Sequence, residues 1–76
     1  MYFKRIKDLR ADHDLPQKRV SEALGISQTK YSALERGVQL WTGELLCRLA
    51  DFYGTSVDYL LNKTNIKAPY PRSPKR

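Results

Sequence analysis

The stretch 17–36 constrains the fold of this chain more than any other part of its sequence. Val20 and Leu24 lie four positions apart, so a helix would place both side chains on one face. Gly25 follows them and tolerates the left-handed backbone that ends a helix abruptly. Ser27 is then a good N-cap for a second helix. The sequence therefore predicts two short helices joined by a tight turn.

The second helix and the turn complete this pattern. Tyr31 and Leu34 share the inward face of the second helix, and Ile26 in the turn can enter the core. Ser21 is small and stands four residues before Gly25, where the second helix would cross close to the first. A small residue, a glycine and later apolar positions at these offsets are typical of a DNA-reading helix-turn-helix.

The rest of the chain predicts three more helices and no sheet. The first three helices are expected over about 2–12, 16–24 and 28–36 by their apolar spacing, with Pro16 at the first position of the second. Thr42 caps a fourth helix that Gly54 ends, and Ser56 caps a short fifth one. Outside the central pair, the expected inward positions are Phe3, Ile6, Leu9, Leu15, Leu46, Leu49, Ala50, Tyr53, Val57, Leu60 and Leu61.

Charge is distributed unevenly along the chain. Residues 1–61 hold nine Lys/Arg against eight Asp/Glu, whereas residues 62–76 hold five Lys/Arg, three prolines and no acid. We expect 1–61 to form one DNA-binding domain whose basic face is arranged by the fold. We expect 62–76 to be a basic, Pro-containing C-terminal tail, extended in solvent or disordered, that can neutralise DNA phosphates.

Several functional classes are disfavoured by composition. The single Cys47 forms no internal disulfide and is expected to be a half-buried small residue, and His13 between two Asp residues is interpreted as part of a polar turn. No nucleophile with its base, phosphate loop, cofactor motif or metal-ligand spacing is present, so we expect no enzyme, no cofactor and no metal. The apolar runs are far shorter than a membrane span, and no signal peptide is recognised. We therefore expect a nucleoid-associated protein in the reducing environment of the cytoplasm.

The order of these motifs resembles the Xre-like family, that of the Cro and lambda/434 phage repressors. The resemblance covers about residues 4–62 and implies a compact, all-α, five-helix lambda-repressor-like domain, with the helix-turn-helix at helices two and three. Beyond the turn, it rests on Ile6-x-x-Leu9-Arg10, Leu15-x-Gln17, Leu34-Glu35-x-Gly37, Leu49-Ala50 and the run Gly54 to Leu61.

In that family the third helix lies in the major groove, with its N-terminal residues at the base edges. The resemblance implies that the base-reading positions here are Gln28, Thr29, Ser32 and Ala33. Gln28 is the strongest candidate, because its amide can donate to and accept from one adenine edge at once. The alternative is that Gln28 is an ordinary solvated residue in a first helical turn.

The resemblance also implies contacts with the DNA backbone and a supporting ion pair. Gln17 matches a position that donates to a phosphate, and Lys18, Lys30 and Arg36 are candidates for phosphate contacts or for a solvated charged face. Arg10 and Glu35 match a pair that bridges the first helix to the third and would fix the recognition helix.

The chain departs from the family in the loop after the third helix. Many relatives place basic or small polar residues there, whereas this sequence has Gln39, Leu40 and Trp41. This leaves a phosphate contact from that loop in doubt, and Trp41 is better suited to the core or to an interface. Pro16 replaces the usual hydroxyl cap of the second helix, a change that its preset backbone angle can offset.

The leading functional hypothesis is a sequence-specific transcriptional regulator, in particular a repressor, that binds a palindromic operator in double-stranded DNA as a homodimer. Phe52, Tyr59 and the end of the fifth helix are candidates for the pairing surface or for ordinary core. Two alternatives remain open: an antitoxin that represses its own operon and binds a toxin, and a protein-interaction module that has lost DNA binding.

Overall fold

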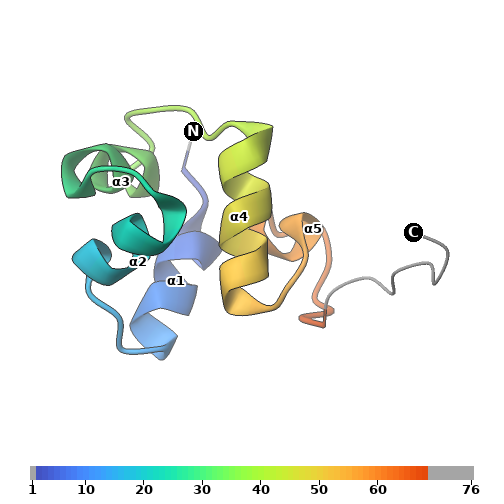
Figure 1. The fold of residues 1–76 in the computed structure, drawn as a ribbon. Helices are drawn as coiled ribbons and strands as arrows, with labels where there is room; N and C mark the ends of the chain where they lie inside the picture. The colour runs from blue at the N-terminus through green and yellow to red at the C-terminus, as the bar shows by residue number, and fades with distance from the viewer. Residues whose placement is uncertain (1, 69–76) are drawn as a thin grey trace, which may run out of the picture.

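The computed structural model describes residues 2–68, and this part of the chain folds into five helices without a strand (Figure 1). The helices are α1 (Lys4–Asp12), α2 (Gln17–Leu24), α3 (Gln28–Glu35), α4 (Gly43–Tyr53) and α5 (Val57–Leu60). The predicted all-α, five-helix architecture is confirmed. Helix α2 begins one residue later than predicted, because Pro16 is extended (φ −75°, ψ 157°) and precedes the first helical residue.

Three of the helices begin at a hydroxyl side chain, as their sequences predict. Ser27, Thr42 and Ser56 each accept a hydrogen bond from the backbone N–H three residues ahead, at 3.0–3.2 Å. Each bond satisfies one of the N–H groups that a helix leaves unpaired in its first turn. These caps fix where α3, α4 and α5 start.

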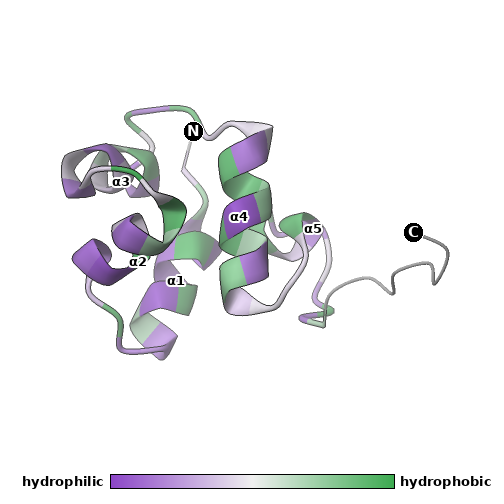
Figure 2. Cartoon of the chain, in the orientation of Figure 1, coloured by the Kyte–Doolittle hydropathy of each residue, from purple (hydrophilic) through white to green (hydrophobic). Residues whose placement is uncertain are grey.

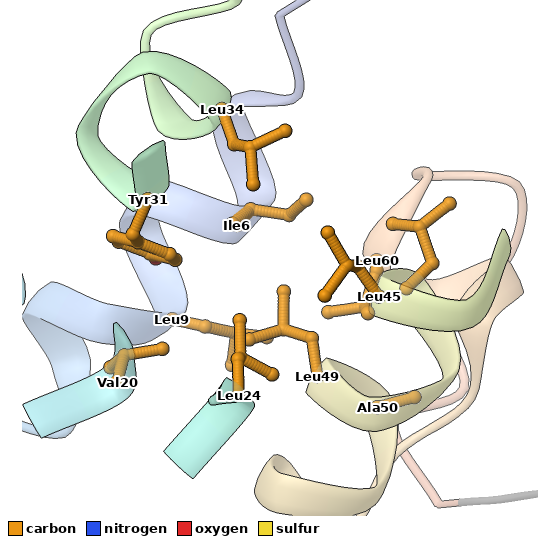
Figure 3. Packing of buried hydrophobic residues seen from close by; sticks show 11 residues of the cluster. Ile6, Leu9, Val20, Leu24, Tyr31, Leu34, Leu45, Leu49, Ala50 and Leu60 are labelled. Atoms are coloured by element: carbon orange, nitrogen blue, oxygen red, sulfur yellow. The ribbon is translucent and has the colours of Figure 1, made fainter. Parts of the chain in front are cut away.

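The core lies where α1, α2 and α3 meet α4 and α5 (Figure 3). It includes Leu45, which the sequence did not place inside; α4 packs against both α2 and α5 and therefore buries a wider stripe. The expectation for Cys47 is wrong, because its side chain is exposed on the outer face of α4. The buried apolar side chains are Ile6, Leu9, Val20, Leu24, Tyr31, Leu34, Leu45, Leu46, Leu49, Ala50 and Leu60.

The turn between α2 and α3 has the geometry that its sequence requires. Gly25 has a φ of +72°, in the left-handed region that favours glycine. The N–H of Ile26 donates to the carbonyl of Ser21 at 3.0 Å and closes the end of α2. Ser21 is only 2% exposed, which allows α2 and α3 to pack closely. The turn thus sets the angle at which α3 is presented.

The chain does not leave the domain at residue 61. Residues 62–67, which we call the strap, fold back against α1 and the α4–α5 connection. The strap starts at Asn62, whose φ is +63°, and the N–H of Lys63 donates to the carbonyl of Asp58 at 2.8 Å. The first part of the expected extended tail is therefore held to the domain, whereas residues 69–76 of that tail lie outside the described residues.

Candidate nucleic-acid interface

Helix α3 has one face in the core and one face at the surface. Tyr31, Leu34 and Glu35 are buried, and they fasten the helix to the domain. The side chains of the opposite face are available to a ligand, and they include every base-reading candidate. Gln28, Thr29 and Lys30 are exposed, and Ser32 and Ala33 are partly exposed.

A hollow of about 290 Å³ lies between the start of α2 and the outer face of α3. It is lined by polar side chains, in line with the hydrophilic colouring of these two helices in Figure 2. The residues that line it are Gln17, Gln28, Thr29, Ser32 and Arg36. The structure therefore brings together five of the eight residues that the sequence selects as candidate DNA contacts.

The other three candidates are arranged differently. Lys18 and Lys30 are exposed cations outside the lining of the hollow. Ala33 is partly exposed, and its carbonyl accepts hydrogen bonds from the loop that follows α3. At this position only the methyl group is free to touch a base.

One buried carboxylate organises the site from below. Glu35 is 4% exposed, and Arg10 binds both of its oxygens, from Nε at 2.6 Å and from Nη2 at 3.0 Å. Gln17 Nε2 also donates to Glu35 at 3.0 Å, and the Tyr31 hydroxyl donates at 2.9 Å. The predicted Arg10–Glu35 bridge between α1 and α3 is present. It extends to Gln17, so the same carboxylate orients the first residue of α2.

The network determines the charge state of Glu35. Burial alone would raise the pKa of this carboxyl group, because it disfavours the ionised form. The hydrogen bonds from Arg10, Gln17 and Tyr31 outweigh burial and hold the pKa of Glu35 below its usual value of 4.5. Glu35 is therefore an anion near neutral pH. Gln17 donates one N–H of its amide to this anion, and among the described contacts the second N–H is available to a ligand.

We expect acid to weaken the fold through Glu35. Because its folded pKa lies below the unfolded value of 4.5, its stabilisation is complete above that pH and is lost as the pH falls through the folded pKa. Urea unfolding across acidic and neutral pH should show this loss in the wild type and a weaker one in Glu35→Gln. Glu44→Gln removes an exposed carboxylate and serves as the control for the loss of one carboxyl group. An identical profile for Glu35→Gln would contradict the assignment.

The loop after α3 is turned toward its own helix. The N–H of Gly37 donates to Leu34, and the N–H groups of Val38 and Gln39 donate to Ala33, at 2.9–3.2 Å. Val38 and Leu40 are each 70% exposed, so this loop presents apolar side chains in place of side chains that could donate hydrogen bonds to a DNA phosphate. These contacts support the sequence-based doubt about a backbone contact here.

Trp41, at the end of that loop, packs inward. It is partly buried, and its ring meets the Tyr31 ring edge-on with the centroids 6.1 Å apart. This position fits the expectation that Trp41 serves the core or an interface, and it places part of the side chain against the core.

Within the described residues, neither a cluster of metal ligands nor a membrane-spanning helix is found. Within residues 2–68, no group of three or more His, Cys, Asp or Glu side chains is arranged to hold a metal ion. His13 instead contacts the Leu9 carbonyl through Nδ1 at 2.9 Å, and its ring lies 5.1 Å from that of Tyr53. No helix in the same range is long and apolar enough to cross a bilayer.

Comparison with known proteins identifies the fold and the motif. A family model described as Helix-turn-helix matches residues 6–60, which include α2, α3 and their turn. The chain belongs to the Xre-like helix-turn-helix family. The match extends over most of the five helices, so it covers the candidate interface together with the core that supports it.

Two relatives of this helix-turn-helix protein bear on its role. The cryptic phage CTXphi transcriptional repressor RstR of Vibrio cholerae is 37% identical over 68 residues, which cover 87% of this chain and 61% of RstR. An uncharacterised HTH-type transcriptional regulator, YobD of Bacillus subtilis strain 168, is 33% identical over 69 residues, which cover 91% of this chain and 62% of YobD. The chain thus spans about three fifths of the length of these relatives.

One residue that supports the helix-turn-helix was not found from the sequence. Arg48 on α4 donates from Nη1 to the Leu24 carbonyl at the end of α2, at 3.2 Å, and its Nη2 pairs with Glu44 at 2.6 Å. The spacing of Glu44 and Arg48 signals a helical ion pair. The contact with Leu24 depends on how α4 packs on α2, which local spacing does not reveal.

Proposed function

We propose that this protein is a sequence-specific DNA-binding regulator and that its polar hollow is the DNA-reading surface. The observation that carries the proposal is the joint placement of Gln17 and Gln28. One stands at the start of α2 and the other at the start of α3, and both line the same hollow. The Gln17 amide can donate a hydrogen bond to a phosphate while the Gln28 amide pairs with a neighbouring base edge.

Direct readout is assigned to the exposed start of α3. Gln28 can pair with an adenine edge through both ends of its amide, and Thr29 offers a hydroxyl and a methyl group for thymine. Ser32 and Ala33 follow along the partly exposed face of the helix. Four residues in one and a half turns span few base pairs, which favours a protein that reads two half-sites.

Contacts with the DNA backbone are assigned to residues beside this face. Gln17 is held by Glu35, and Arg36 donates from Nε to the Ser32 hydroxyl at 3.3 Å at the edge of the hollow. Lys18 on α2 and Lys30 on α3 are exposed and would add positive charge to these two helices. Such contacts position the protein on DNA without reading its sequence.

We further propose that the protein is a repressor that works as a homodimer. Its relative RstR is named as a transcriptional repressor, which supports repression as the direction of regulation. Phe52 and Tyr59 are only partly buried against the core. Because the Arg5 guanidinium lies over one face of the Tyr59 ring, we assign the pairing surface to the exposed part of Phe52 and the open edge of Tyr59 at the α4–α5 end. Two-fold pairing there would let two copies of α3 read a palindrome.

Pairing predicts the spacing of the DNA contacts. We expect an imperfect palindrome whose half-sites are centred about 10 base pairs apart, one turn of B-DNA. A hydroxyl-radical footprint should show two related protected regions at this spacing, with two protein chains bound for each duplex. A single asymmetric footprint with one chain bound would contradict the dimer.

A gel shift with genomic DNA fragments at stated salt concentrations tests the function itself. Retention of a subset of fragments in the presence of excess nonspecific DNA supports the proposal. Failure to shift any fragment would favour the interaction-module alternative. A neighbouring reading frame for a small toxin, together with copurification of its product, would favour the antitoxin alternative.

A further inference from the structure

The strap is fastened to the domain chiefly by one side chain, Arg5 on α1. Its Nη1 donates to the carbonyl of Thr64 at 2.8 Å and to that of Tyr59 at 3.2 Å. Its Nη2 donates to Asn65 Oδ1 at 3.2 Å, and its guanidinium carbon lies 4.2 Å from the centre of the Tyr59 ring. One cation thus joins α1, α5 and the strap, and a planar guanidinium suits these divergent acceptors.

A second fastener holds the far end of the strap. The hydroxyl of Thr55, a residue only 4% exposed, donates to the carbonyl of Lys67. The N–H of Ile66 donates to Thr64 Oγ1 at 3.2 Å within the strap itself. Ile66 is 64% exposed, so hydrophobic burial contributes little to holding the strap. Polar contacts from Arg5 and Thr55 are its main attachments.

The strap lies at the opposite end of the molecule from α3, with α4 and α5 beside it (Figure 1). Two basic residues, Lys63 and Lys67, lie within the strap, and three more follow it in the sequence: Arg72, Lys75 and Arg76. The nine residues after the strap span at most about 30 Å even when fully extended, and release of the strap would lengthen that reach by about 20 Å.

We propose that Arg5 is a latch that fastens the strap to α1 and thereby limits how far the basic C-terminal residues reach toward DNA held by α3. With the latch closed, the strap ends on the side of the domain away from the recognition helix (Figure 1). With the latch open, all five charges join a longer arm that can neutralise additional phosphates. The DNA part of this inference rests on the proposed function, whereas the latch itself does not.

Limited proteolysis of the full chain tests the latch without DNA. Trypsin cleaves after Lys63 and Lys67, and cleavage at these bonds reports opening of the strap. In Arg5→Gln we expect cleavage there to accelerate about tenfold, because three hydrogen bonds and a cation–π contact are lost. Cleavage after Lys18 and Arg19, in α2, should stay at the wild-type rate.

The matched control is Lys4→Gln. It removes the same charge from the neighbouring position, but among the described residues Lys4 pairs only with Asp8, at the exposed surface of α1. This variant should cleave like the wild type. Equal acceleration in α2 and in the strap of Arg5→Gln would mean that Arg5 merely stabilises the whole fold and would overturn the latch. Unchanged cleavage of the strap would overturn it as well.

Thr55→Val provides an independent test should Arg5→Gln fail to fold. This nearly isosteric change removes the bond to the Lys67 carbonyl. Cleavage after Lys67 should then accelerate more than cleavage after Lys63, which Arg5 still holds. Equal acceleration at both bonds relative to the wild type, or no change at either bond, would show that the strap is not fastened in this way.

The restriction on reach is tested by the salt dependence of binding to a short mixed-sequence DNA duplex. Each phosphate newly neutralised by the released arm should steepen the log–log slope by about 0.9 in Arg5→Gln relative to Lys4→Gln. The same salt slope in both variants would contradict the proposal that the closed latch limits the reach of the basic residues toward DNA. If neither variant nor the wild type binds DNA, the proposed function fails, while the proteolysis result still decides whether the latch exists.

Discussion

Arg10→Met should destabilise the protein by about 3–5 kcal/mol, the cost of breaking a buried ion pair by removing one partner. The substitution leaves the carboxylate of Glu35, which is 4% exposed, without its only cationic partner among the described contacts. It also removes the bond from Nη1 to the Leu15 carbonyl, at 2.8 Å. Urea unfolding at neutral pH would measure the change.

Two controls separate this loss from a general effect of charge. Lys4→Met deletes a cation whose ion pair with Asp8 is fully at the surface, and it should leave the unfolding midpoint unchanged. The double variant Arg10→Met/Glu35→Gln removes the unpaired buried charge and should recover part of the loss. A loss below about 1 kcal/mol for Arg10→Met would show that the network is not what holds α1 to α3.

Gln28→Ala should weaken binding to the best DNA site by about 1–3 kcal/mol and relax the preference at one base pair. Gln28 is exposed at the first turn of α3 and lines the hollow, so truncating it should cost little stability. Binding isotherms for the best site and for all its single-base variants would measure both effects.

Lys30→Ala is the matched control for this prediction, because Lys30 is exposed on the same helix turn but lies outside the hollow. It should weaken binding about equally for all sequences and reduce the salt slope by about 0.9, as expected for one phosphate contact. If Gln28→Ala behaves in the same way as Lys30→Ala, Gln28 is a backbone contact and direct readout must be reassigned.

Most of the fold was predictable because its signals are local. Ser27, Thr42 and Ser56 mark helix starts through bonds that span only three residues, and Gly25 and Gly54 mark helix ends through a backbone conformation that other residues rarely adopt. The inward faces of α2 and α3 follow from helical spacing alone. These features require no knowledge of the tertiary arrangement.

The contacts that were missed connect distant segments. Arg5 meets residues more than fifty positions away, and its acceptors are mostly backbone carbonyls, which every residue type provides. The strap has no apolar periodicity, so its sequence predicted only an extended tail. Cys47 was misplaced because its exposure depends on which side of α4 the other helices cover.

The candidate site was predicted through resemblance more than through physical pattern. Spacing identifies the outer face of α3, but the pairing of Arg10 with Glu35 was expected only from the family. The bond from Gln17 to Glu35 joins two helix ends, and it emerges only once α2 and α3 are packed. Local chemistry therefore defines the helices, and packing assembles the site.

Selection of binding sites from random duplex DNA tests the central claim, that the hollow between α2 and α3 reads base sequence. The wild type should enrich an imperfect palindrome with half-sites about 10 base pairs apart. Gln28→Ala, selected in parallel, should enrich the same palindrome with one position per half-site relaxed. No enrichment by the wild type, or the same fully specified motif from Gln28→Ala, would contradict the claim.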